Sequence, residues 1–175
     1  MSDAHDSAME EWPSFARIPI DEVLPAPRPK GQKLARFVWW EGALKEASSL
    51  GVHYYANALH YGTAVFEGIR VYPTESGPCI FRLRDHIDRL IGSAHLYGMT
   101  LPFSADDLVQ GAIEVTSQNG IDNGYLRPLA YFGYGPIDMR PKTQCPVQVF
   151  IAARELGSFL GENALRNGIR VTVSS

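Results

Sequence analysis

The chain has 175 residues, of which 45% are apolar and 20% are charged, a composition typical of a globular protein with a real core. Its formal net charge of -3 shows none of the basic excess that nucleic acids or anionic membranes attract. The expected partners are therefore small molecules or other proteins.

Several prolines among scattered charges, including Pro13, Pro25, Pro27 and Pro29, mark residues 1–33 as a loosely attached arm, so order is expected from about residue 34. Residues 35–47 then predict a β-hairpin that turns at Glu41 and Gly42. The next stretch, HYGTAVFEGIR at residues 60–70, is ambiguous because it is neither an aliphatic run nor an apolar–polar alternation. A strand at 69–72, a turn at 73–78 and a strand at 79–83 are expected after it.

Two amphipathic helices follow. Residues 84–98 place one apolar stripe at helical spacing, made of Ile87, Leu90, Ile91 and Ala94. For residues 104–120, Ser104 can cap the helix with Asp107 three positions on, and Asn119 with Gly120 supplies a stop.

The rest of the chain returns to β-rich sequence. Strands are expected at 125–135 and 146–153, joined by the loop 136–144, followed by a short helix at 161–168. Strands, two helices and strands again imply an α+β arrangement. Residues 169–175, IRVTVSS, look like a strand that opens a new sheet with nothing after it to pair, which suggests a truncated product.

Arginine is the informative residue type, because its planar fork binds carboxylates and phosphates bidentately. Arg70, Arg89 and Arg127 stand out. Strand alternation puts Tyr125, Arg127 and Leu129 on one face. Two interpretations are open. Tyr125 and Arg127 form a clamp for a ligand carboxylate, or Arg127 makes a structural ion pair with Glu67 or Asp122.

Gly62 and Gly68 are either turn residues or positions that keep a ligand pocket open. The chain carries no readable Ser-His-Asp arrangement, GxGxxG motif or phosphate-binding P-loop motif. From the residues alone, the sequence predicts an anion-oriented pocket with aromatic walls, without specifying a reaction.

Histidines and cysteines give no metal or disulfide signature. His53 and His60 are interpreted as packed polar residues, so no metal site is expected. Cys79 and Cys145 are interpreted as free buried thiols. Without an apolar leader or a run of about 18 apolar residues, the protein is expected to be soluble and cytoplasmic.

Residues 58–72, 81–99 and 125–133, taken together and in this order, closely resemble the N-terminal part of branched-chain amino acid aminotransferases, which are class IV pyridoxal phosphate (PLP) enzymes. The resemblance covers about residues 36–175. It implies a fold type IV enzyme with a small α+β domain at 34–153, an antiparallel sheet with two helices. An interdomain linker at 154–161 and the start of a cofactor domain at 162–175 would follow.

The implied activity is transamination of branched-chain amino acids with 2-oxoglutarate or glutamate, by a homodimer of a longer enzyme. Matching residue by residue, the resemblance assigns Arg89 to the cofactor phosphate and Tyr125 with Arg127 to the substrate carboxylate. It also places Phe66 and Gly68 against the substrate side chain. Tyr61, which is shared across the dimer interface, and Phe159 are assigned to substrate binding as well.

This chain departs from the family pattern in two ways. Leu156 and Phe159 stand where the family commonly has a tryptophan and a tyrosine, so the preferred side chain is open. The Schiff-base lysine of the family has no match among Lys30, Lys33, Lys45 and Lys142, so the chain alone is expected to be inactive. The alternatives are a D-amino acid or amine transaminase, a lyase, or a short non-catalytic dimerisation module.

Overall fold

The computed structural model describes residues 35–141, 144–157 and 161–173. The expected arm at residues 1–33 lies outside this part of the chain, as does Phe159. Three of the four lysines, Lys30, Lys33 and Lys142, also lie outside it.

The strands form one antiparallel sheet in the order β2-β1-β7-β6-β4-β5, and β3 also pairs with β6. Their bounds are β1 (Phe37–Trp40), β2 (Ala43–Glu46), β3 (Ala64–Phe66), β4 (Ile69–Thr74), β5 (Gly77–Ile80), β6 (Gly124–Phe132) and β7 (Val147–Glu155). The hairpin β1–β2 turns at Glu41 and Gly42 as predicted, and both residues have positive φ, which its tight turn requires.

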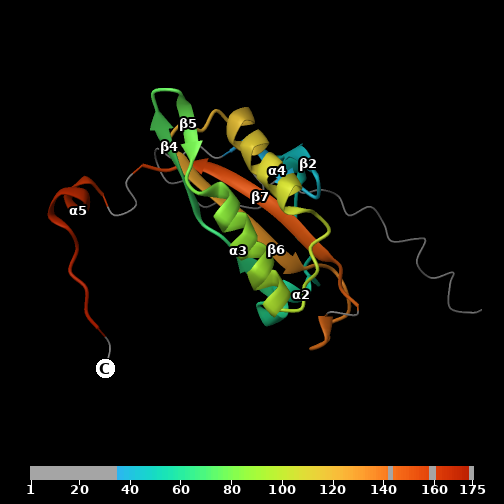
Figure 1. Cartoon of the computed structure of the whole chain (residues 1–175). Helices are drawn as coiled ribbons and strands as arrows, with labels where there is room; N and C mark the ends of the chain where they lie inside the picture. Colours follow the sequence, from blue (N-terminus) through green and yellow to red (C-terminus); the bar gives the residue numbers. More distant parts are fainter. Residues whose placement is uncertain (1–34, 142–143, 158–160, 174–175) are drawn as a thin grey trace, which may run out of the picture.

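The helices are α2 (Asn57–Tyr61), α3 (Leu83–Leu96), α4 (Ala105–Gln118) and α5 (Glu162–Asn167), with a 3-10 turn at Ala47–Ser49. Figure 1 shows α3 and α4 against one face of the sheet and α5 apart from it. The predicted capping box is present, because the Ser104 hydroxyl accepts from the Asp107 N–H and the Asp107 carboxylate accepts from the Ser104 N–H. These layers confirm the α+β class.

The core lies between the sheet and the two long helices. The predicted stripe of α3 is confirmed, with Ile87, Leu90 and Ala94 fully buried. Along β6, Leu126, Pro128 and Ala130 are buried, whereas the residues that alternate with them, Tyr125, Arg127 and Leu129, are half-buried on the other face. We call this second surface the open face of the sheet.

Three local expectations are wrong. The turn predicted at 73–78 is shorter, because Pro73 and Pro78 are paired with each other in the β4–β5 hairpin. Strand β4 pairs with β6 only at residues 69–71, so neither proline interrupts the β4–β6 hydrogen bonds. Residues 169–173 form no strand, since a strand needs a hydrogen-bonded neighbour and the described residues supply none there. Cys79 is exposed on the edge strand β5, while Cys145 is buried as expected.

Candidate functional site

The ambiguous stretch at residues 60–70 contains a helix end and two strands. Tyr61 is the last residue of α2, and Gly62 ends this helix with φ 67, so Gly62 serves as a turn residue. Strands β3 and β4 then follow one another along β6. Glu67 and Gly68 interrupt the pairing between them, although the Glu67 N–H still donates to the Pro128 carbonyl at 3.0 Å.

Glu67 is a buried carboxylate with two partners on α3. Its side chain accepts hydrogen bonds from Nε and Nη2 of Arg89, and His86 Nδ1 lies 2.9 Å from its Oε2. Burial acts to raise the pKa of Glu67, but the hydrogen bonds from Arg89 and His86 outweigh it and hold the pKa below its usual value. The alternative that Arg127 pairs with Glu67 is therefore wrong, because Glu67 binds Arg89 instead.

Arg89 keeps donors free for a second anion. Its side chain is 65% exposed while that of Glu67 is 6% exposed. A guanidinium has five N–H groups, of which Glu67 engages only part. The exposed edge borders a small hollow of about 300 Å³, lined by Phe81, Arg82, Asp85, His86 and Arg89.

Tyr125 and Arg127 contact one another on the open face, and their role as a carboxylate clamp stays a prediction. Arg127 Nη2 donates to the Tyr125 hydroxyl at 2.8 Å, and its guanidinium carbon lies 4.2 Å from the centroid of the Phe66 ring. Asp122 is exposed, and no ion pair joins it to Arg127 among the described residues.

Gly68 is required by the close approach of Tyr125. A Cβ atom at position 68 would lie 2.1 Å from the Tyr125 hydroxyl oxygen and 2.9 Å from its Cζ. The structure thus brings Phe66, Gly68, Tyr125 and Arg127 into one contiguous group. Glu67 links this group to Arg89 through its own side chain.

The remaining candidates lie elsewhere. Tyr61 is 43% exposed near His60. His60 is exposed, its Nε2 2.8 Å from the Tyr54 carbonyl, and His53 is half-buried among tyrosine rings. In the part of the chain that the structure describes, no three His, Cys, Asp or Glu side chains are grouped as metal ligands. Among the same residues, no helix is both long and apolar enough to cross a bilayer.

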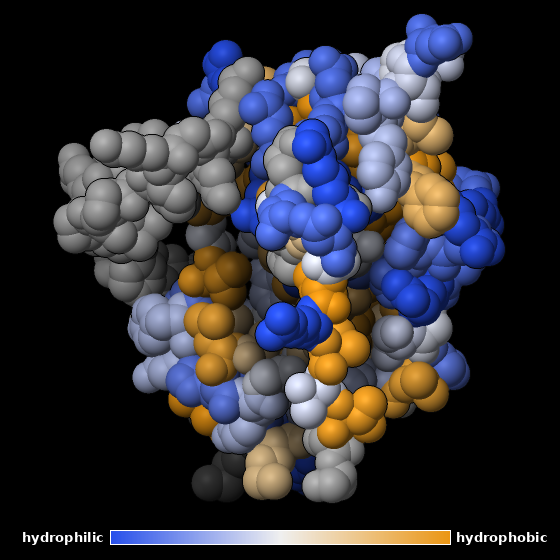
Figure 2. Space-filling view, turned by 90° about the vertical axis from the view of Figure 1, so that its left-hand side faces the viewer, coloured by the Kyte–Doolittle hydropathy of each residue, from blue (hydrophilic) through white to orange (hydrophobic). Residues whose placement is uncertain are grey.

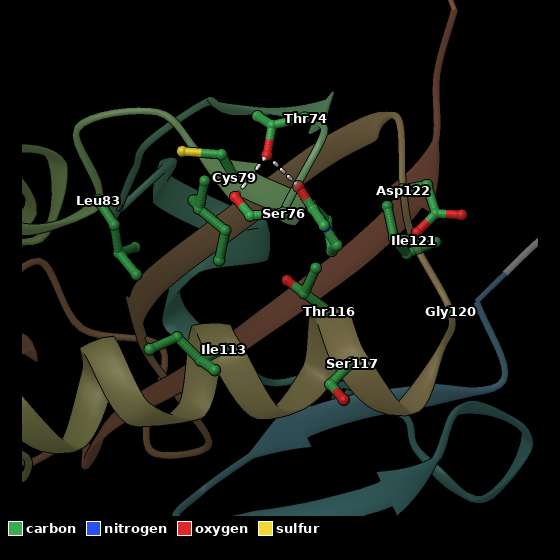
Figure 3. A pocket seen from close by; sticks show the side chains of 13 residues that line it. Thr74, Ser76, Cys79, Leu83, Ile113, Thr116, Ser117, Gly120, Ile121 and Asp122 are labelled. Atoms are coloured by element: carbon green, nitrogen blue, oxygen red, sulfur yellow. Dashed lines mark hydrogen bonds between the residues drawn. The ribbon is translucent and has the colours of Figure 1, made fainter.

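A larger cleft lies away from these residues, between the β4–β5 hairpin and the C-terminal half of α4 (Figure 3). Its volume is about 920 Å³. The Thr74 hydroxyl donates to the Gly77 carbonyl at 2.6 Å at its rim, and Ile113 and Ile121 belong to its wall. None of the residues that the resemblance assigns to substrate or cofactor lines it.

Sequence reasoning missed the role of Glu67 as the partner of Arg89. A signal was available, because His86 and Arg89 are three positions apart and so share one face of the helix. An acid preceding Gly68 inside a β-rich run needs such a cation if it is buried. Choosing between Arg89 and Arg127 required the side of the sheet to which Glu67 points.

Comparisons with known proteins identify the family of this chain. Residues 64–174 match the family model described as amino-transferase class IV. A branched-chain-amino-acid aminotransferase of Pseudomonas aeruginosa is 38% identical over 138 residues, which is 79% of this chain and 45% of that protein.

The solved structures that this chain resembles also include branched-chain aminotransferases. The Escherichia coli branched-chain amino acid aminotransferase is 38% identical, with a TM-score of 0.76 over 81% of this chain and 46% of that one. The T.th. enzyme of the same name is 39% identical, with a TM-score of 0.68 over 70% of this chain and 41% of that one, both in a complex with N-(5'-phosphopyridoxyl)-L-glutamate and in one with 4-methylvaleric acid. The chain spans about half the length of the relatives it matches.

Proposed function

The chain belongs to the class IV aminotransferase family, and on this premise we propose that it forms part of a PLP-dependent branched-chain-amino-acid aminotransferase. The proposed reaction exchanges amino groups between branched-chain amino acids and 2-oxoglutarate. The solved relatives named above are branched-chain aminotransferases, and one was solved with a glutamate adduct and with an aliphatic acid. We place the protein in the cytoplasm.

The group formed by Phe66, Gly68, Tyr125 and Arg127 carries this proposal. The Arg127 guanidinium, oriented by the Tyr125 hydroxyl at 2.8 Å and by the Phe66 ring, binds a substrate carboxylate. The Phe66 side chain is 56% exposed and offers an apolar wall to an aliphatic chain. One cation beside aromatic rings suits a pocket that accepts acidic and aliphatic side chains in turn.

Arg89 would hold the phosphate of the cofactor. The fit rests on its exposed N–H groups and on the buried Glu67 carboxylate, which fixes the guanidinium from behind. PLP supplies the electron sink and the temporary carrier of the amino group. These residues therefore fit one requirement of the cofactor, which is a set of oriented N–H donors for its phosphate.

The proposed homodimer is supported by exposed aromatic and apolar side chains around α2. Tyr54, Tyr55, Leu59, Tyr61 and Tyr134 are each at least 42% exposed. An exposed apolar group of this kind is typical of an interaction site. Tyr61 would lie at this interface.

We retain the domain division as part of the proposal, with an arm at 1–33, a small domain at 34–153, a linker at 154–161 and the start of a cofactor domain at 162–175. Strand β7 runs to Glu155, so regular structure extends two residues into the proposed linker. Ile169, Val171 and Val173 are 59%, 78% and 92% exposed. Figure 2, seen from the side on which α5 lies in Figure 1, shows apolar patches among hydrophilic residues.

A chimera tests the proposal. Residues 36–173 replace the matched segment of the Escherichia coli enzyme, and the product is supplied with PLP, leucine and 2-oxoglutarate. Formation of glutamate at an enzymatic rate is the expected result, while the 175-residue chain alone should form none. The Arg127→Gln chimera should lose most of the activity, whereas Arg84→Gln, on an exposed surface of α3, should keep it.

The same chimera separates the alternatives through a panel of amino donors. Turnover of D-alanine or of an arylalkyl amine in preference to leucine would assign a different class IV activity. A folded chimera that binds PLP, as its absorbance would show, but transfers no amino group from any donor would refute the proposal in favour of a non-catalytic module.

A further inference from the structure

Three arginines share the open face of the sheet with Tyr125. Arg70 on β4 and Arg154 on β7 are the direct cross-strand partners of Tyr125 on β6, one on each side. Side chains of directly paired residues point to the same face of a sheet. Arg127 lies two positions along β6 and therefore shares that face too.

Two of these guanidinium groups, those of Arg127 and Arg154, lie near the ring of Tyr125. The guanidinium carbons of Arg127 and Arg154 are 5.3 and 5.9 Å from the centroid of the same Tyr125 ring. Arg70 is held by uncharged acceptors, the Gly157 carbonyl at 3.1 Å and Asn123 Oδ1 at 3.2 Å. All three arginines are half-buried.

No carboxylate within the described residues pairs with any of these three arginines. By comparison, a carboxylate lies within 4 Å of five of the seven other described arginines, Arg36, Arg82, Arg84, Arg89 and Arg140. The remaining two, Arg166 and Arg170, are exposed to solvent rather than half-buried. Like charges gathered on a half-buried surface repel one another and lose part of their hydration. An anionic ligand would remove both costs.

We infer that Arg154 is a specificity-determining residue, which adds a second cation to the Tyr125–Arg127 pair and selects ligands that carry two carboxylates. The inference rests on the proposed function, because it names the acidic oxo acid or amino acid as the preferred partner of that site. One carboxylate binds Arg127 and the Tyr125 hydroxyl. The other binds Arg154, which lies beside the same Tyr125 ring and forms no ion pair with a described carboxylate.

The test measures binding by the full 175-residue chain, without cofactor or turnover. Glutarate, with two carboxylates, and 4-methylvalerate, with one, are titrated by calorimetry and by the NMR signals of the arginine Nε–H groups. Arg154→Gln should weaken glutarate binding about tenfold and change 4-methylvalerate binding by less than about twofold. Arg154→Lys should restore part of the glutarate affinity, because it keeps the charge without the planar fork.

Arg84→Gln is the matched control, since this arginine is exposed on α3 and pairs with Asp88 and Asp106. It should leave both affinities unchanged. Glutarate binding that survives Arg154→Gln intact, or a wild-type chain that binds glutarate no better than 4-methylvalerate, overturns the inference. An inactive chimera would count only against the proposed transamination. Unchanged glutarate binding by Arg154→Gln would count only against the role of Arg154, so the two failures are distinguishable.

Discussion

Gly68→Ala should destabilise the protein by forcing Tyr125 away from Arg127. The added Cβ would lie 2.1 Å from the Tyr125 hydroxyl oxygen and 2.9 Å from Cζ, both well inside contact distance. Gly68 is not among the glycines with positive φ, so alanine meets no left-handed backbone strain there and the cost comes from this contact. Overpacking of this kind costs about 1–3 kcal/mol in the free energy of unfolding.

A double-mutant cycle with Tyr125→Phe isolates the contact. Tyr125→Phe removes the oxygen at 2.1 Å together with the hydrogen bond from Arg127, and by itself should cost about 1 kcal/mol. In the double variant the alanine methyl has no hydroxyl to displace. The sum of the single costs should therefore exceed the cost of the double variant by about 1 kcal/mol.

Urea unfolding of the four proteins, followed by circular dichroism, gives these free energies. Gly92→Ala is the matched control, because a Cβ at this position in α3 meets nothing within 4 Å. It should stabilise the protein by about 0.5–1 kcal/mol, the difference in helix propensity. If the costs of the two single substitutions add up to that of the double variant within about 0.5 kcal/mol, the Tyr125 hydroxyl and a Cβ at position 68 do not compete for space. That result would refute the steric account of Gly68.

The remaining predictions concern the core and the buried acid. Gly111→Ala should cost about 1–3 kcal/mol in urea unfolding, because its Cβ would lie 2.6 Å from the Trp39 indole. Glu67→Gln should lower stability at pH 7 by about 1.5–3 kcal/mol. Because the pKa of Glu67 is lowered in the folded protein, its stabilisation is present above pH 4.5 and is lost as the pH falls through the folded pKa. The difference in unfolding free energy between the wild type and Glu67→Gln should therefore shrink in acid. A difference that stays constant with pH would contradict the ion pair between Glu67 and Arg89. Tyr131→Phe should leave stability unchanged or raise it by about 1 kcal/mol, because this buried hydroxyl has no hydrogen-bond partner among the described residues and burial raises its pKa to about 12. A loss above about 1 kcal/mol would reveal a partner.

The sequence by itself determined the elements whose signals are local. The apolar stripe of α3, the Ser104 cap of α4 and the turn at Glu41 and Gly42 each depend on residues a few positions apart. The two-residue alternation of β6 likewise puts Tyr125 and Arg127 on one face, which follows from their spacing alone. The strand expected at 169–175 does not form over its described residues, 169–173, because strand formation depends on a neighbour as well as on composition.

Only the tertiary structure decided which side chains meet across the fold. Glu67 binds Arg89 across 22 residues, and Gly68, between β3 and β4, lies against Tyr125. Arg154 lies opposite Tyr125 because β7 pairs with β6 in one register, and a shift of a single residue would turn it to the other face. The packing of the whole sheet against its helices fixes the register of the strands and the face on which each side chain lies where a strand is interrupted. Local sequence patterns therefore do not determine either.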